Sequence, residues 1–146
     1  MMLSVIFVRC KIFLGLQRGD GMFFIDQDKT VHITRGDAAV FAIGAKRDGA
    51  AYTFQPGEVV RLCVFGKKNC TDVVLQRDVI VAEATEKVNI MLSKEDTKIG
   101  KKVNKPVDYW YEVELNPDTY PQTIVGYDED GAKIFKLYPE GLRVGV

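Results

Sequence analysis

Two acidic groups have side chains that could form a metal or catalytic site. Asp26 and Asp28 form the first group, and the second consists of Asp128, Glu129 and Asp130. Paired carboxylates could bind calcium, or could act as the acid and base of a glycosidase. Neither group has the spaced oxygens and terminal glutamate of a calcium loop, and nothing nearby supplies a partner that tunes a pKa. We therefore interpret both groups as hairpin and turn residues.

Histidine and cysteine, which bind transition metals, are scarce. His32 is the only histidine, so a multi-histidine metal site or a Ser-His-Asp triad would have to rely on one residue. The three cysteines are Cys10, Cys63 and Cys70, without a Cys-x-x-Cys spacing. Cys63 and Cys70 could bridge across a hairpin, but an odd count favours reduced thiols made in a cytosol. We predict no metal, no cofactor, no catalytic residue and a structural role for His32.

The tripeptide Arg-Gly-Asp occurs at residues 18–20 and again at residues 35–37. Integrin binding would need this motif on an exposed loop of a secreted protein, and the sequence shows no sign of secretion. Gly36 permits a backbone conformation that other residues reach only with strain. Asp37 can hydrogen-bond nearby amides. We predict that residues 34–37 form a tight corner between two strands.

Trp110 is the side chain best suited to recognition. In the segment VDYWYEVELN, residues 107–116, a period of two places it on the same face as Asp108, Glu112 and Glu114. Aromatic rings beside acids occur on sugar-binding surfaces, and tryptophan is enriched at protein interfaces. Packing beneath a loop or beneath the N-terminal segment is the structural alternative. We take Trp110 and Glu112 as interface candidates.

The composition is that of a soluble globular protein. The chain has 146 residues, of which 47% are hydrophobic and 27% charged, enough for one domain with a core of its own. Its 20 basic and 20 acidic residues give no net charge. Nucleic-acid-binding proteins usually carry a basic patch, so we expect no nucleic-acid partner.

The N-terminal segment, residues 1–16, is apolar but is not predicted to cross a membrane. Arg9 and Lys11 interrupt it, and the uncharged run before them is far shorter than the ~20 residues of a membrane helix. A signal peptide usually has its charges before the apolar region and a small-residue cleavage site after it. Val5 and Phe7 are good strand formers, so an added edge strand is one interpretation.

A later translation start is the other interpretation of this segment. Residues 18–21, Arg-Gly-Asp-Gly, stand directly before Met22, and their codons could read as a purine-rich ribosome-binding sequence. We expect translation to begin at Met22. This divides the chain into an extension at residues 1–21, a β-sandwich domain at residues 22–141 and a tail at residues 142–146.

From Met22 onward the sequence predicts short strands separated by strong turns, which is typical of a sandwich or barrel. Ser93 and Asp96 are spaced like a capping box, so one short helical turn is expected there, ending by Gly100. Residues 122–127 and 132–137 are expected to form a closing hairpin. The predicted strands are residues 23–25, 30–34, 38–45, 51–54, 58–65, 72–77, 79–84, 87–92, 107–116, 122–127 and 132–137.

Several motifs cover most of the chain from Met22 onward. They are MFFIDQD at residues 22–28, VHITRGD at residues 31–37, Asp48-Gly49, Leu92-Ser93, DYWYEV at residues 108–113, and Asp130-Gly131 before IFKL at residues 134–137. In this order and spacing, the motifs resemble the N-terminal domain of the phage baseplate upper protein family. The family implies an immunoglobulin-like antiparallel β-sandwich that is a structural part of a tail tip in phages and prophages of Gram-positive hosts.

The resemblance implies a non-enzymatic component of a tail or baseplate that acts through protein–protein contacts. Its partners would be other tail proteins, with homo-oligomers in the assembled particle and neither nucleic acid nor membrane bound. The protein would lie in the virion tail, and in the bacterial cytoplasm during assembly. A carbohydrate-binding module that recognises a host surface glycan through the Trp110 face is the alternative.

Overall fold

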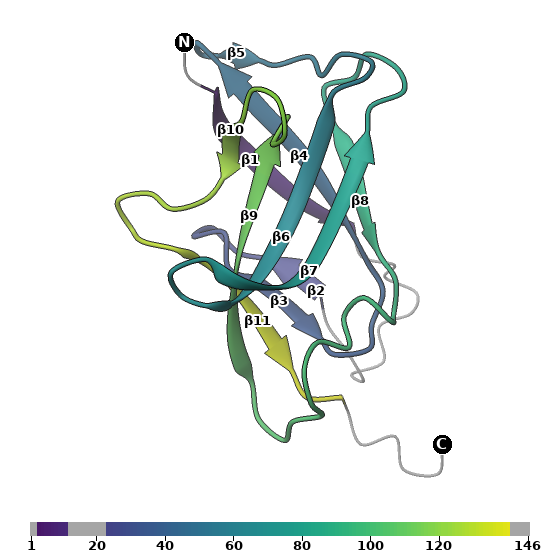
Figure 1. Cartoon of the computed structure of the whole chain (residues 1–146), viewed down its shortest axis with the longest axis vertical. Coiled ribbons are helices and arrows are strands. Elements are labelled where there is room, and N and C mark those ends of the chain that lie inside the picture. The colour runs from purple at the N-terminus through teal and green to yellow at the C-terminus, as the bar shows by residue number, and fades with distance from the viewer. Residues whose placement is uncertain (1–2, 12–22, 141–146) are drawn as a thin grey trace.

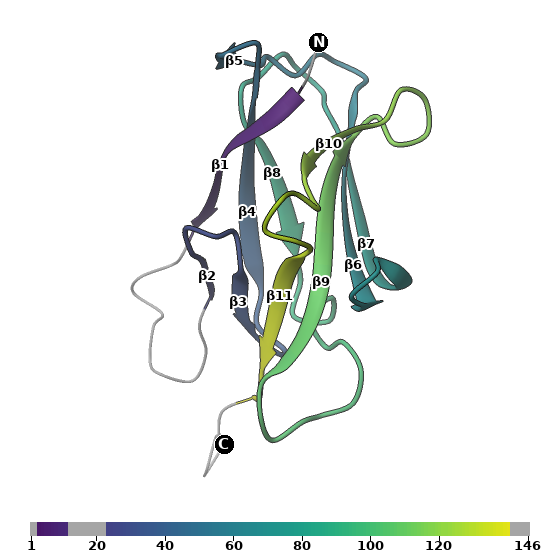
Figure 2. The same ribbon diagram turned by 90° about the vertical axis from the view of Figure 1, so that its left-hand side faces the viewer.

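The structure is a computed structural model. It describes the backbone of residues 3–11, and both the backbone and the side chains of residues 23–140. These residues form β-strands and connecting turns, and the strands run along the long axis of the molecule (Figures 1 and 2). The strands are β1 (Leu3–Lys11), β2 (Phe23–Ile25), β3 (Val31–Thr34), β4 (Ala39–Arg47), β5 (Ala50–Ala51), β6 (Val59–Lys67), β7 (Thr71–Ile80), β8 (Val88–Leu92), β9 (Val107–Leu115), β10 (Gln122–Val125) and β11 (Lys133–Tyr138).

The strands form two sheets. The seven-stranded sheet has the order β2-β3-β11-β9-β6-β7, with β10 also paired to β9. In the four-stranded sheet, β4 pairs with β1, β5 and β8. The pairing is antiparallel throughout the described strands except between β3 and β11, which are parallel. The predicted all-β fold of antiparallel sheets is confirmed, and it is consistent with the predicted β-sandwich.

The core lies between the sheets, where strands such as β8, β9 and β11 alternate buried apolar residues with more exposed ones. In β9 the side chains of Tyr111, Val113 and Leu115 are buried, as the period of two predicts. In the opposite sheet, Phe41 and Ile43 of β4 are fully buried. Apolar side chains from both sheets therefore fill one continuous interior.

The corner predicted at residues 34–37 is confirmed, and it carries the chain from one sheet to the other. β3 belongs to the seven-stranded sheet and β4 to the four-stranded sheet. Gly36 has a φ of +88°, a conformation that favours glycine. The Gly36 N–H donates to Thr97 Oγ1 at 2.9 Å, and the Thr97 hydroxyl donates to the Asp37 carbonyl at 2.8 Å. The corner is thus fastened to a distant loop.

The edge strand predicted in the N-terminal segment is present as β1, which runs antiparallel to β4. Met22, where we expect translation to begin, and the tail at residues 142–146 lie outside the described residues. The extension and domain boundaries therefore remain predictions.

Three details of the predicted strand pattern are wrong. Residues 51–54 were expected as a strand, but β5 ends at Ala51, and Phe54 forms only an isolated bridge with Thr85. Residues 72–77 and 79–84 were expected as separate strands, but β7 runs unbroken through Asp78, whose side chain pairs with Arg61 on the neighbouring strand. β10 and β11 do not form a closing hairpin, because both pair with β9, one after the other along its length. The nine residues of β9 are long enough to hold both short strands on one edge.

The expected capping box forms without a helix. The Ser93 N–H donates to Asp96 Oδ2 at 2.8 Å, and the Asp96 N–H donates to Ser93 Oγ at 3.2 Å. Residues 94–97 form a turn, and no residue of the described chain is helical. The predicted helical turn is therefore not confirmed, although its reciprocal hydrogen bonds are present.

Candidate interaction surfaces

Trp110 and Glu112 lie on the outer face of the seven-stranded sheet, on the central strand β9. Both side chains are half-buried. Trp110 pairs with Ile134 of β11 on one side and with Phe65 of β6 on the other. Phe65 in turn pairs with Val73 of β7, whose side chain is 54% exposed. Ile134, Trp110, Phe65 and Val73 thus form an apolar row across four strands, which we call the outer row.

Glu112 occupies a poor site for a charge. It pairs with Cys63 in the register of β9 and β6. Burial raises the pKa of Glu112, the charge of Glu114 raises it further, and a hydrogen bond with the Cys70 side chain acts in the opposite direction. Cys63 and Cys70 are free thiols, as predicted, and the side chain of Cys10 lies outside the described residues.

Replacing Glu112 with glutamine is expected to stabilise the protein near pH 7. Because the folded state raises the Glu112 pKa above its ordinary 4.5, this carboxyl favours folding when protonated, and that contribution is lost as the pH rises through the folded pKa. Urea unfolding at about pH 4 and about pH 7 should show Glu112→Gln gaining stability over the parent as the pH rises. The exposed Glu129, changed to glutamine, is the control. An equal gain in both variants would contradict the assignment.

His32 is held on three sides. Its ring stacks on Phe24 with centroids 4.3 Å apart. Nε2 lies 2.7 Å from Asp26 Oδ2, and Nδ1 lies 2.8 Å from the Tyr138 hydroxyl. Both ring nitrogens are occupied by neighbours that tie β3 to the preceding turn and to β11, which fits the predicted structural role. The contact between His32 and Tyr138 was not predicted, because Tyr138 lies far from His32 in the sequence and belongs to no motif.

The acidic groups sit in turns, as predicted. The Thr30 N–H donates to Asp28 Oδ1 at 2.9 Å and to Asp26 Oδ1 at 3.2 Å. Asp128 accepts hydrogen bonds from Lys133 Nζ at 2.6 Å and from the Asp130 N–H at 2.9 Å. Among the described residues, no three His, Cys, Asp or Glu side chains are grouped so that they could hold a metal ion.

The turn carboxylate Asp28 is expected to make stability fall in acid. Hydrogen bonds with Asp26 and Thr30 lower the pKa of Asp28 from 3.8 to about 2. Between these values the unfolded chain binds more protons, so Asp28 contributes stability above its ordinary pKa and loses this contribution as the pH falls through about 2. Urea titrations from about pH 5 to about pH 2 should show a shallower decline for Asp28→Asn. Parallel declines for the parent and the variant would contradict this expectation.

The second Arg-Gly-Asp motif is committed to internal contacts. Arg35 Nη1 donates to Glu140 Oε1 at 2.7 Å, Nε donates to the Ile99 carbonyl at 3.3 Å, and Nη2 donates to the Gly100 carbonyl at 2.9 Å. Only 12% of the Arg35 side chain is exposed. The guanidinium therefore joins the corner to two other segments. The first motif, at residues 18–20, lies outside the described residues.

β7 is an edge strand that the sequence did not mark as unusual. It pairs with β6 on one side and ends the seven-stranded sheet. Along its ten residues only Leu75 and Val79 are half-buried, and all others are exposed. Ile80, at its end, is 70% exposed. A long edge with apolar side chains is a template on which another strand can pair.

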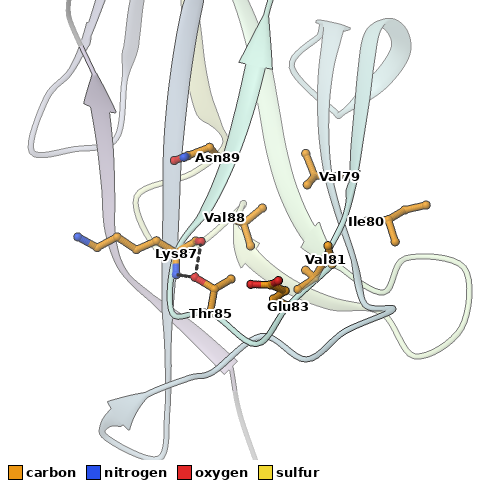
Figure 3. A pocket seen from close by; sticks show the side chains of 9 residues that line it. Val79, Ile80, Val81, Glu83, Thr85, Lys87, Val88 and Asn89 are labelled. Carbon is orange, nitrogen blue, oxygen red and sulfur yellow. Dashed lines mark hydrogen bonds between the residues drawn. The ribbon is translucent and has the colours of Figure 1, made fainter.

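A hollow of about 260 Å³ lies where β7 ends and β8 begins. Figure 3 shows Val79 and Val81 on one side of it and Val88 on the other. Glu83 also lines the hollow and has no ion pair within the described part of the chain. The Lys87 side chain extends away from Glu83 (Figure 3). The hollow is therefore lined mainly by apolar residues, and its polar residues are Glu83, Thr85, Lys87 and Asn89.

Beyond the hollow, an ion pair connects the two sheets at this edge. Arg77 Nη2 of β7 lies 2.6 Å from Asp96 Oδ2, in the turn that follows β8. The edge of β7 is therefore polar at Arg77 and apolar at Val79.

No protein-family model, curated protein or solved structure matches the chain. Within the described residues there is no helix that is long and apolar enough to cross a membrane.

Proposed function

We propose that this chain is a non-enzymatic structural component of a phage or prophage tail, and that it acts through protein–protein contacts. The phage context rests on the family resemblance of residues 22–141. The observation that carries the contact function is the outer row, which leads from Trp110 across Phe65 to Val73 on the open edge strand β7. Phe65 is only 8% exposed, but Val73 at the open end of the row is 54% exposed. A protein that worked alone would leave that apolar end in solvent.

We further propose that the sandwich is immunoglobulin-like. In that fold, a central strand is flanked by two neighbours in one sheet, and the variable type adds further strands at the edge. β9 flanked by β11 and β6, with β7 beyond, fits this order. The pairing of β4 with β8 in the other sheet supports it as well.

In a tail, identical copies of a subunit are commonly arranged by rotational symmetry, and one surface patch then makes the same contact in every copy. We propose that the chain forms such homo-oligomers in the assembled particle, beside other tail or baseplate proteins. Its final location would be the virion tail, reached after assembly in the bacterial cytoplasm.

The second candidate function is recognition of a host surface glycan. The half-buried Trp110 ring shares its face with Glu112 and Glu114, and carboxylates beside an aromatic ring suit sugar hydroxyls. A protein contact is favoured because the row beside Trp110 continues through apolar residues to a strand edge.

Capture of partners by the tagged full chain from a lysate of induced host cells tests the proposed function. We expect other tail proteins to be recovered, and Val73→Lys to reduce their recovery because it places a charge at the exposed end of the outer row. Met91→Lys is the matched control, since Met91 is 68% exposed on the other sheet. A glycan array in which binding is strong and is lost in Trp110→Ala, with no tail protein captured, would replace this proposal with the second candidate.

A further inference from the structure

We propose that β7 accepts an extended segment of a partner protein as an additional strand. One apolar side chain of that segment enters the hollow beside Val79, and a basic residue two positions away, on the same face of the segment, lies toward Glu83. This inference rests on the proposed contact function and specifies the form of the contact. The added strand would extend the order of the seven-stranded sheet beyond β7.

The backbone of β7 is suited to strand addition. One edge pairs with β6, and within the described residues no backbone group from another segment bonds to the other edge. Natural edge strands are usually protected by lysine, by proline, by an inward-pointing charge or by being short. β7 is ten residues long and contains neither lysine nor proline, and its inward-facing charge, Arg77, is paired with Asp96. A register shift between Val64 and Phe65 of β6 interrupts only its first half. Residues 75–80 therefore form a regular acceptor edge.

The hollow gives this edge a specific anchor position. Leu75, Arg77 and Val79 of β7 pair with buried residues of β6, so these alternate side chains face the opposite sheet. A strand added beside β7 alternates in the same way. Its side chain next to Val79 would point into the hollow, where Val81 and Val88 are nearly fully buried. An apolar side chain at that position would be removed from water.

Charge defines the second residue of the segment that faces the hollow. Glu83 and Lys87 both line the hollow, but the Lys87 side chain points away from Glu83 (Figure 3). Glu83 has no ion pair among the described residues, whereas Arg77 is paired with Asp96. A lysine or arginine of the incoming segment, on the same face as the anchor, would complement the Glu83 carboxylate.

The same charges disfavour a second copy of β7 as the occupant. If two β7 strands paired about a two-fold axis through Arg77 or through Asp78, identical charges would lie directly opposite each other, which is destabilising. An axis through Gln76 would set the irregular residue Val74 opposite Asp78, and an axis through Leu75 would bring Asp72 opposite Asp78. An axis through Val79 would leave only residues 78–80 of each strand paired. A basic segment of another protein avoids these problems.

The probe is a synthetic peptide of about ten residues that alternates threonine and valine. A central phenylalanine and a lysine two positions from it replace valines on the same face. Binding to the full chain is followed by amide hydrogen exchange. We expect slower exchange at residues 75–80. Two further peptides carry N-methyl groups on alternate backbone amides, one at the odd-numbered residues and one at the even-numbered residues. Only one of these two peptides should lose binding, because only one set of amides donates main-chain hydrogen bonds to β7. A peptide with glutamate in place of the lysine should bind about twofold to fivefold more weakly.

Charge reversal at the hollow supplies the matched variants. Glu83→Lys should weaken binding of the lysine peptide and strengthen binding of the glutamate peptide, each by about twofold to fivefold. Glu86→Lys, on the same loop outside the hollow, should do neither. Both side chains are exposed, so both variants are expected to fold. Equal effects of the two substitutions, protection elsewhere in the chain, or equal binding by both methylated peptides would overturn the proposal.

Two further outcomes distinguish this proposal from the proposed function. If the full chain captures tail proteins but the peptide does not bind, strand addition is wrong and the contact function stands. If the chain neither captures tail proteins nor binds the peptide, the proposed function and the strand addition are both wrong. Protection of residues 75–80 that grows with protein concentration in the absence of peptide would identify a second copy as the occupant and overturn the inference.

Discussion

Replacing Tyr111 with alanine is expected to lower the free energy of unfolding by about 3–5 kcal/mol, as for other buried aromatic side chains. Tyr111 is completely buried between the sheets, and its ring contacts that of Phe135 edge-on, with centroids 6.3 Å apart. Its hydroxyl donates to the Lys29 carbonyl at 2.6 Å. The substitution therefore creates a cavity and leaves the Lys29 carbonyl without this donor. Urea unfolding followed by circular dichroism measures the loss.

Two variants separate the cavity from the hydrogen bond. Tyr111→Phe keeps the ring and should cost about 0.5–1.5 kcal/mol, which is the usual net contribution of one hydrogen bond. Tyr120→Ala removes a tyrosine that is 73% exposed and should change stability by less than about 0.5 kcal/mol. Similar losses for Tyr111→Ala and Tyr120→Ala would show that the core is not organised around β9.

Replacing Arg35 with alanine is expected to cost about 2–3 kcal/mol, since hydrogen bonds to charged groups contribute about 1.5–3 kcal/mol. The Arg35 guanidinium donates to the Glu140 carboxylate and to the carbonyls of Ile99 and Gly100. Its removal would free the corner between β3 and β4 from two distant segments. Arg35→Lys should recover only part of the loss, because an ammonium lacks the planar set of donors. The measurement is again urea unfolding.

The control for Arg35 is Arg77→Ala. Arg77 also forms a close ion pair, with Asp96, but 45% of its side chain is exposed, and such surface pairs contribute at most about 1 kcal/mol. If Arg35→Ala were no more destabilising than Arg77→Ala, the Arg-Gly-Asp corner would not be the structural junction described above.

Local patterns carried most of the strand prediction. The alternation in residues 107–115 identified β9 and its inward face, because a strand exposes successive side chains on opposite sides. Gly36 marked the corner correctly, because its positive φ is a requirement of that single residue. The carboxylates of Asp26 and Asp28 were placed in a turn for an equally local reason, since they bond to an amide only a few residues away.

Contacts between distant residues were not predictable in the same way. The mistaken closing hairpin followed from the closeness of β10 and β11 in the sequence, whereas their partner is the long strand β9. The bond between His32 and Tyr138 joins residues that no local pattern connects. The face that carries Trp110 and Glu112 was predicted, but their half-burial depends on the neighbouring strands.

The sequence alone therefore determined an all-β chain, its principal strands, their inward faces and the corner at Gly36, because backbone conformation and side-chain periodicity are local properties. The tertiary structure alone decided which strands lie at an edge and what lies across the gap between the sheets. That is why the open edge of β7 and the hollow beside Val79 became visible only in the folded chain. Both arise from the packing of segments that are separate in the sequence.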